Sequence, residues 1–375
     1  MDFDLTDEQE ATAEAATKLL ADKSTPEALR ALEQRDDLRF DRDLWASMAG
    51  AGLLGIAVPE EHGGAGLGLL ELCLVLQEVG RRTAAVPALP VLAFAGLPIA
   101  RHGTPEQQAR ILPGMTAGTL LPVAALVEPL ADPLVPTTTA KPDGDGWVLE
   151  GTKTNVLAGL IADVFVIPAS TPDGIGLFLV PGDAEGLTRT RQETTSGTPD
   201  ALLVLEGVRV GAGDVLGEID AGGSTLRSTV EEATVAACAV AAGLCAEAVR
   251  ITGEYTTSRE QFGRPIATFQ AVGQRAADAY VDSHAIRLTM LQAAWRLSAG
   301  YPAAREVAVA KYWASAGGQR VVHAASHLHG GVGVDRDYPL HRYFLLAKEL
   351  ELTLGGGTRQ LVNLGRILAA EGAPT

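Results

Sequence analysis

The sequence predicts an α+β protein with an N-terminal helical domain, a middle antiparallel β-domain and a C-terminal four-helix bundle. Two observations lead to this prediction. Helix-type hydrophobic periodicity occupies both ends of the chain, and short β-type runs separated by turn residues lie between them. The 375 residues also exceed what a single hydrophobic core usually serves. We therefore expect three domains, at residues 1–118, 119–220 and 221–375.

The N-terminal domain contains two patterns that start helices. Thr6–Gln9 and Thr104–Gln107 are both capping boxes, in which the threonine hydroxyl caps the helix and the glutamine reaches back to the cap backbone. Periodic apolar residues predict further helices over 44–54 and 69–79. The glycine-rich segment 59–68 (PEEHGGAGLG) is interpreted as a plain turn between them.

The middle and C-terminal parts differ in hydrophobic period. After the turn at Asp143–Gly146, short apolar runs read WVLEG, DVFVIPA, IGLFLVP and ALLVLEGVRV. Their connections are too short for the crossover helices that parallel strands need, so we expect a small antiparallel barrel or sandwich. The C-terminal helical patterns span 224–258, 266–299, 303–327 and 340–368.

One apolar segment, Ala233–Val249, approaches the length of a membrane span. It consists mostly of small residues and contains Glu247, so we expect a buried helix that neighbouring helices approach closely, and no membrane span. The cysteines show no CxxC spacing and are predicted to be reduced core residues; they are Cys73, Cys238 and Cys245.

The charge balance excludes some partners. Acidic residues outnumber basic ones by 46 to 30, which gives a net charge of −16 and repels phosphate backbones and anionic lipid surfaces. Nucleic acid is therefore not an expected partner. The acidic opening MDFDLTDEQE lacks the basic and apolar regions of a secretory signal, so a cytoplasmic location is expected.

Two C-terminal segments carry a family resemblance. REQFGRPIATFQ (Arg259–Gln270) resembles the Arg-x-x-Phe-Gly segment and following Gln of acyl-CoA dehydrogenases, and HLHGGVGVDRDYPLHR (His327–Arg342) resembles their Gln-x-x-Gly-Gly and Tyr-Pro-x-x-Arg run. MDFDLTDEQ, PEEHGGAG and the domain order are also similar to the family, so the resemblance covers nearly the whole chain. It implies FAD as cofactor and α,β-dehydrogenation of an acyl-CoA thioester.

The resemblance also implies contacts to the adenosine diphosphate half of an FAD that a neighbouring subunit mainly binds. The residues concerned are Arg259, Phe262, Gln270, His327, Gly330 and Gly331. Arg259 offers a forked donor to pyrophosphate, Phe262 offers apolar packing, and the glycine pair lets backbone N–H groups approach an anion. His327 stands where the family commonly has Gln. The alternatives are that Arg259 pairs with a local carboxylate and that the glycines only end a helix.

Histidines near the second motif raise the possibility of a metal site. His323 and His327 are four residues apart, and His329 follows, but no cysteine or carboxylate at useful spacing joins them. Helix-capping and core roles are favoured for these side chains, and no metal site is expected.

The family's catalytic base is a buried glutamate that removes the α-proton. A gap-free alignment of the C-terminal motif places Leu354 at the commoner base position, and a frame matched on Gly-Gly-Thr places Gly356 there. The second family position falls on Ala233. Glu232 is adjacent, but one residue turns a side chain about 100° around a helix. Glu232 is therefore a weak candidate base, and its alternative is a solvated first-turn glutamate favoured by the helix dipole.

Other substitutions affect the implied flavin-ring and thioester sites. Asn155, Val156 and Leu157 stand where the family places Trp-Ile-Thr against the flavin ring. Thr234 replaces an arginine beside acyl-CoA, and Asp132-Pro133 replace Gly-Ser. The resemblance therefore implies that one half of the active site was lost and the diphosphate half was kept.

The sequence is most similar to the non-catalytic subunit of heterotetrameric bacterial acyl-CoA dehydrogenases of the steroid side-chain type. We expect a homologous catalytic subunit to supply the glutamate, the flavin-ring site and the acyl-CoA site. Two alternatives stay open. The chain could be a self-sufficient dehydrogenase that uses Glu232, or a flavin-free structural or acyl-CoA-binding homologue.

Overall fold

The computed structural model describes residues 4–35, 38–219 and 221–371, which form two compact units. The segments of unit 1 are Met1–Arg30, Cys73–Ala84 and Thr234–Thr375, and those of unit 2 are Ala31–Leu72 and Ala85–Ala233. Three helices contribute residues to both units: α2 (Pro26–Glu33), α4 (Leu69–Arg81) and α7 (Gly222–Ser258). The three domain boundaries expected from the sequence stay a prediction.

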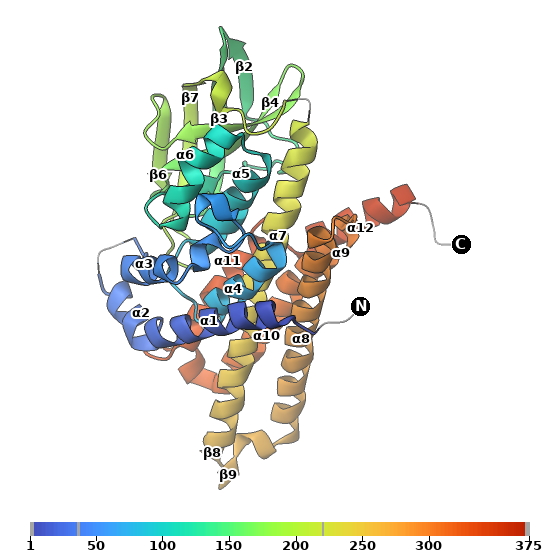
Figure 1. Ribbon diagram of the computed structural model, residues 1–375. Coiled ribbons are helices and arrows are strands. Elements are labelled where there is room, and N and C mark those ends of the chain that lie inside the picture. The colour runs from blue at the N-terminus through green and yellow to red at the C-terminus, as the bar shows by residue number, and fades with distance from the viewer. Residues whose placement is uncertain (1–3, 36–37, 220, 372–375) are drawn as a thin grey trace. The chain divides into compact units, whose positions relative to one another are not determined.

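Unit 2 contains one seven-stranded sheet in the order β1-β4-β2-β3-β7-β6, with β5 paired to β4 (Figure 1). Its strands are β1 (Pro122–Ala124), β2 (Thr139–Asp143), β3 (Gly146–Val156), β4 (Val164–Thr171), β5 (Gly174–Pro181), β6 (Leu187–Arg191) and β7 (Ala201–Val210). Most pairs are antiparallel, as predicted, but β1 and β2 each pair with β4 in parallel. The expectation that short connections exclude parallel pairs was wrong, because the β2–β3 hairpin itself forms the crossover between β1 and β4.

Short helices complete unit 2. They are α3 (Arg42–Gly50), η1 (Leu53–Gly55), η2 (Glu60–His62), η3 (Leu89–Gly96), α5 (Leu97–His102), α6 (Pro105–Thr116) and η4 (Ala212–Asp214). The predicted capping box of α6 is confirmed, since the Gln107 N–H donates to Thr104 Oγ1 at 3.3 Å and the Thr104 N–H donates to Gln107 Oε1 at 3.1 Å. The glycine-rich segment is a tight turn around η2, where a Cβ on Gly64 would lie 1.9 Å from the Val58 carbonyl oxygen.

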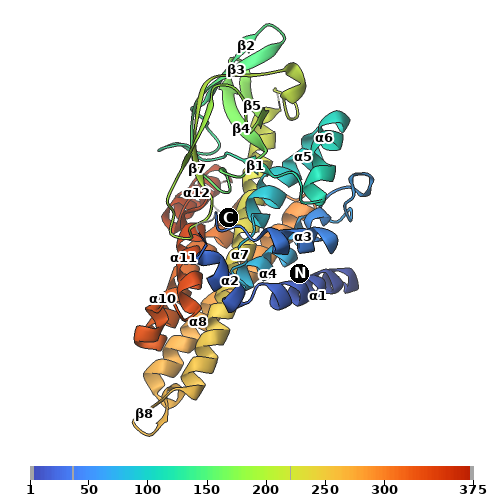
Figure 2. The ribbon, with the colours of Figure 1, turned by 90° about the vertical axis from the view of Figure 1, so that its left-hand side faces the viewer.

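Unit 1 is helical apart from a hairpin that joins α7 to α8 (Figure 2). Its elements are α1 (Asp7–Lys23), β8 (Glu260–Gln261), β9 (Arg264–Pro265), η5 (Ile266–Thr268), α8 (Gln270–Ser298), α9 (Ala304–Tyr312), η6 (Trp313–Gly317), α10 (Gly318–His329), η7 (Gly330–Val334), α11 (Leu340–Leu352) and α12 (Gly357–Glu371). The capping box predicted at Thr6 begins α1. The helix predicted over 340–368 is in fact two helices, because Leu354 and Gly355 take positive φ values of 56° and 100°.

The apolar segment predicted to be a buried helix lies within α7, and this prediction is confirmed. By length and composition α7 could cross a membrane, but 83% of its most apolar window is buried. Within unit 1, a Cβ on Gly80 of α4 would lie 2.0 Å from the Val240 carbonyl oxygen, and one on Gly243 would lie 1.7 Å from that of Gln77. Small residues therefore let α4 and α7 touch backbone to backbone. All three cysteines are buried and free, as expected.

Candidate functional site

A groove of about 590 Å³ opens in unit 1 beside the end of α7, the β8–β9 hairpin and the end of α10. Its lining residues are Tyr255, Arg259, Gln261, Ile266, His327, Leu328, His329, Gly330, Gly331, Val332 and Asp335. Four of the six residues predicted to contact the cofactor are among them, although the two motifs that supply these residues are separated in sequence. The fold thus brings together Arg259, His327, Gly330 and Gly331.

Arg259 follows the last residue of α7 and is exposed. Its backbone is fixed on both sides, since its N–H donates to the Tyr255 carbonyl and its carbonyl accepts from the Ile266 N–H, each at 2.8 Å. Across residues 4–35, 38–219 and 221–371, no carboxylate pairs with its guanidinium. The local ion pair considered as an alternative is therefore absent from the described residues, and the side chain can receive an anionic group from outside the chain.

The glycine pair ends α10 and also lines the groove. Gly330 has φ 62° and ψ −138°, a conformation that only glycine adopts readily, and its N–H caps the His327 carbonyl. A Cβ built on Gly330 or Gly331 would meet no heavy atom within 4 Å. The two glycines therefore end α10 and, at the same time, leave their backbone open to the groove.

His329, the residue before Gly330, is held in place by contacts of its imidazole ring. It is buried and stacks on Tyr255 with ring centroids 4.3 Å apart. Its Nδ1 lies 2.8 Å from the Ala325 carbonyl, so Nδ1 carries the proton and Nε2 accepts from the Tyr338 hydroxyl at 3.2 Å. Burial lowers the pKa of the imidazole. A neutral side chain thus fixes the backbone that precedes Gly330.

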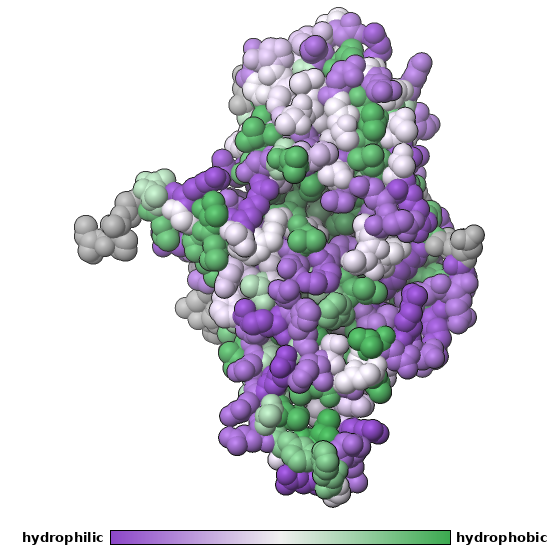
Figure 3. Space-filling view, turned by 180° about the vertical axis from the view of Figure 1, so that it is seen from behind, coloured by the Kyte–Doolittle hydropathy of each residue, from purple (hydrophilic) through white to green (hydrophobic). Residues whose placement is uncertain are grey.

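Two predicted cofactor residues do not line the groove. Phe262 is at the tip of the hairpin, 92% exposed and with φ 54°, and its ring contacts Phe269 edge-on at 6.1 Å. Gln270 is the exposed first residue of α8. Figure 3 shows hydrophobic atoms gathered at the end of unit 1 that carries β8 and β9. The roles expected for these two residues stay predictions.

Sequence reasoning missed several groove residues. Gln261 belongs to the first motif and Asp335 to the second, but neither position had an expected role. Asp335 Oδ1 accepts a hydrogen bond from the Asp337 N–H at 2.9 Å, so one oxygen of this carboxylate is bound to the backbone of its own turn. An unpaired guanidinium and an open glycine backbone suit a diphosphate, so the groove fits the cofactor half that the motifs imply.

Both positions expected for the catalytic base are apolar and buried. Leu354 is 6% exposed and Ala233 is fully buried, and neither side chain can accept a proton. The alternative position, Gly356, has no side chain. None of the three positions expected for the base carries a carboxylate, and loss of the catalytic glutamate stays a prediction.

Glu232 is neither solvated nor in the first helical turn, so that interpretation was wrong. It lies ten residues after the start of α7 and is 3% exposed. Its carboxylate accepts from the Arg101 guanidinium of α5. Burial raises the pKa of Glu232 to about 7, although Arg101 opposes that shift. The side chain can hold a proton near neutral pH.

Glu128, a buried carboxylate near the start of the β-domain, differs from Glu232 in its protonation. Glu128 accepts from Lys153 Nζ at 2.6 Å and from the Thr138 N–H at 3.0 Å. Burial alone would raise its pKa, but Lys153 and the hydrogen bonds lower the pKa of Glu128 to about 2. Glu128 is therefore a permanently charged structural group.

Asn155, at the position expected beside a flavin ring, has φ 48° and donates its N–H to Gln192 Oε1 at 2.6 Å.

The histidines considered for a metal are dispersed. Over the described ranges, no group of three or more His, Cys, Asp or Glu side chains converges as a metal site would require. His323 contacts the Phe344 ring with centroids 4.9 Å apart, His327 lines the groove and His329 is in the core.

Family models match most of the chain. The N-terminal domain of acyl-CoA dehydrogenases matches residues 6–119, the middle domain residues 130–205 and the C-terminal domain residues 220–370. The chain is similar to acyl-CoA dehydrogenase FadE27 of Mycobacterium tuberculosis, with 40% identity over 98% of this chain and 99% of that protein.

Two solved structures of complexes are also similar. One is the ChsE4-ChsE5 complex from Mycobacterium tuberculosis, with 39% identity, a TM-score of 0.94 and complete coverage (100%) of both chains. The other is a variant of the Tcur3481-Tcur3483 steroid ACAD, with 44% identity, a TM-score of 0.92 and coverage of 98% of this chain and 99% of that chain. Together with the family models and the observed fold, these similarities show that the chain belongs to the acyl-CoA dehydrogenase family.

Proposed function

We propose that this chain is the FAD-binding, non-catalytic subunit of a heteromeric acyl-CoA dehydrogenase that acts on a steroid side-chain CoA thioester. One observation carries the proposal. The groove keeps an unpaired Arg259 and an open glycine backbone, while both expected base positions hold buried apolar residues. A chain built in this way can bind a diphosphate but cannot remove an α-proton at the family's positions.

The relatives support a heteromer. Both similar complexes are named for two different chains, and one is named as a steroid ACAD. Phe262 is 92% exposed at the tip of the hairpin, so its burial against another protein surface would be favourable. We infer that a homologous catalytic subunit covers it, and that the complex works in the cytoplasm.

Each subunit has a separate task in the proposed complex. Bound FAD supplies the hydride acceptor for oxidation of the acyl chain. Arg259 would donate to the diphosphate, while Gly330 and Gly331 would offer backbone N–H groups. His327, Phe262 and Gln270 would complete the contact from this side. The partner would supply the glutamate base, the flavin-ring contacts and the acyl-CoA site.

Co-expression with a homologous acyl-CoA dehydrogenase encoded nearby tests the proposal. We expect this chain alone to be colourless and inactive, and the co-purified complex to be yellow and to reduce an artificial electron acceptor with acyl-CoA. The Arg259→Ala complex is the matched control, because it should assemble but retain less flavin. A yellow homomer that turns over acyl-CoA unaided would overturn the proposal.

The second candidate function is a self-sufficient dehydrogenase, and the observation that favours it is the environment of Glu232. A buried carboxyl group with a pKa of about 7 is suited to general base catalysis, so the chain could be a self-sufficient dehydrogenase. Its hydrogen bond to Arg101 opposes this role, because the pairing stabilises the charged form and occupies the carboxylate. A flavin-free homologue is the third possibility. It predicts no absorbance near ~450 nm in any stable complex.

A further inference from the structure

Asp335 places a negative charge in a groove that is otherwise suited to an anion. It lines the groove together with Arg259 and the glycine pair, and it is exposed. Its N–H donates to the Val332 carbonyl at 3.2 Å and its Oδ1 accepts from the Asp337 N–H at 2.9 Å, so the turn fixes the position of the residue. The second carboxylate oxygen, Oδ2, is left to accept a hydrogen bond from a ligand.

The groove therefore contains two opposite charges that do not neutralise each other. In the part of the chain that the structure describes, neither the Arg259 guanidinium nor the Asp335 carboxylate forms an ion pair. The other polar side chains of the lining are Tyr255, Gln261, His327 and His329. Two of these, the Tyr255 hydroxyl and the His329 ring, already have partners within the unit. A ligand that fills the groove thus meets a cation and a carboxylate at separate positions.

An ester of adenosine diphosphate satisfies both charges. Its diphosphate accepts from the Arg259 guanidinium and from backbone N–H groups, while its ribose hydroxyls donate to a carboxylate. In dinucleotide-binding proteins an acidic side chain takes this second role, and an arginine accommodates the ribose where it is phosphorylated. The groove, at about 590 Å³, also has the size of a small-molecule site, which is about 300–1,000 Å³.

Two such esters meet in the proposed complex. FAD has free hydroxyls on its adenosine ribose, whereas the adenosine ribose of acyl-CoA has a phosphate at its 3′ position. The diphosphate is common to both molecules, so Arg259 and the glycine pair cannot distinguish them. A carboxylate can, because the 3′-phosphate replaces a hydroxyl donor with negative charge.

We propose that Asp335 makes this groove selective for FAD, because it accepts hydrogen bonds from the free ribose hydroxyls and repels the 3′-phosphate of CoA. This role rests on the proposed function, which brings both nucleotides to one complex. Asp335 then has a task that the diphosphate contacts do not perform, namely to keep the CoA nucleotide out of the cofactor groove.

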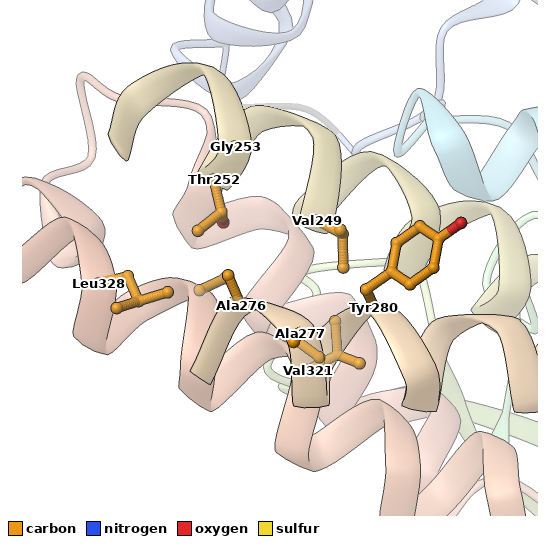
Figure 4. A pocket seen from close by; sticks show the side chains of 10 residues that line it. Val249, Thr252, Gly253, Ala276, Ala277, Tyr280, Val321 and Leu328 are labelled. Atoms are coloured by element: carbon orange, nitrogen blue, oxygen red, sulfur yellow. The ribbon is translucent and has the colours of Figure 1, made fainter. Parts of the chain in front are cut away.

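The surroundings of the groove offer no second fixed cation to a 3′-phosphate. A cavity of about 390 Å³ adjoins the groove, since Leu328 lines both. Figure 4 shows its wall, formed by α7, α8 and α10, and none of its lining residues is charged. The Thr252 hydroxyl in this wall already donates to the Ala248 carbonyl at 2.6 Å. Arg336 follows Asp335 in sequence but is not one of the residues that line the groove.

Removal of the Asp335 charge tests this selectivity. Calorimetry of the flavin-free complex, at about pH 8 so that histidine charge does not contribute, would compare binding of ADP with binding of 3′-phosphoadenosine 5′-diphosphate. The wild type should bind ADP at least about 10-fold more tightly. Asp335→Asn keeps an oxygen for the Asp337 N–H but loses the charge, so the preference should fall below about threefold. Asp335→Glu keeps the charge and should keep the preference.

Asp337→Asn is the matched control, because Asp337 belongs to the same turn but lies 3.8 Å from Arg30 and does not line the groove. It should keep the wild-type preference. An unchanged preference in Asp335→Asn, an equal loss in Asp337→Asn, or no binding of either nucleotide by the wild type would overturn the role of Asp335. Flavin content keeps the two proposals distinct: a wild-type complex that purifies without flavin but still prefers ADP contradicts only the proposed function.

Discussion

The groove lined by Arg259 and the glycine pair differs from the positions expected for a catalytic base in the groups that each presents. The groove keeps an unpaired guanidinium and a glycine backbone with no side chain above it, whereas Leu354 and Ala233 fill the base positions with buried hydrocarbon. Proton abstraction depends on one carboxylate, so a single substitution abolishes it. The proposed anion site is instead formed by a turn, a helix end and a hairpin together. Under the proposed function, catalysis can therefore be lost by a single substitution that leaves the FAD-binding groove unchanged.

The largest effect is expected at Arg259. Under the proposed function, Arg259→Ala would remove charge-assisted hydrogen bonds to the diphosphate, so FAD affinity of the complex should fall about 10- to 100-fold. Flavin absorbance per mole of complex, followed during dilution, measures this. Arg264→Ala is the control, because Arg264 is on the same hairpin but lies over the Phe269 ring. An equal loss in both variants would show that the hairpin matters and the Arg259 charge does not.

Alanine variants of Gly330 and Gly331 distinguish the effect of turn geometry from the effect of ligand contact. Gly330→Ala forces a Cβ into a glycine conformation and should lower the free energy of unfolding by about 1–3 kcal/mol, as well as weakening FAD. Gly331→Ala lacks that strain and should change stability by less than about 0.5 kcal/mol, while its methyl group still obstructs the groove. Denaturant titration and flavin content of both variants provide the test. Retention of flavin by Gly331→Ala would place the diphosphate elsewhere.

A smaller effect, on pH dependence, is expected at Glu232. The pKa of this carboxyl group is about 7 in the fold and 4.5 normally, so the native state binds the extra proton. The free energy of unfolding of the wild type should therefore fall, by about 1–3 kcal/mol, as pH rises from about 4.5 to about 7. Glu232→Gln should flatten this decline and leave turnover of the complex unchanged. Loss of turnover in this variant would favour the self-sufficient dehydrogenase.

The smallest expected change in activity follows restoration of the carboxylate. Leu354→Glu returns a proton acceptor to the commoner family position, but Asn155, Val156 and Leu157 still occupy the expected flavin-ring strand. The isolated variant should show no acyl-CoA-dependent reduction of an electron acceptor above the wild-type background. Measurable turnover would mean that a single residue separates this chain from a catalytic subunit.

Local patterns in the sequence identified local structure well. The Thr6 and Thr104 capping boxes, α4 and the buried part of α7 follow from residues within a few turns of each other. Parallel pairing of β1 with β4 and the break at Leu354 were missed. Strand pairing depends on non-local contacts, and apolar periodicity continues through a short helix break.

In the candidate site, too, sequence motifs led to some residues and could not lead to residues that depend on non-local contacts. Motif resemblance led to Arg259, His327 and the glycine pair, which the structure brings to one groove, while their contacts to FAD stay predictions. It could not identify the Arg101–Glu232 pair, whose members are 131 residues apart. Because burial of Glu232 depends on α5 packing beside α7, no property of its neighbours in sequence distinguishes it from a solvated glutamate.

The backbone contact of α4 with α7 limits which amino-acid substitutions the protein tolerates at Gly80 and Gly243. Any single-nucleotide missense change in the codon for Gly80 or Gly243 introduces at least a Cβ, which would lie 2.0 Å or less from a carbonyl oxygen of the facing helix. These two codons are constrained in this way whatever cofactor or partner the protein binds. Deep mutational scanning by abundance should show both glycines among the least tolerant positions, ahead of the groove residues Arg259 and Gly331.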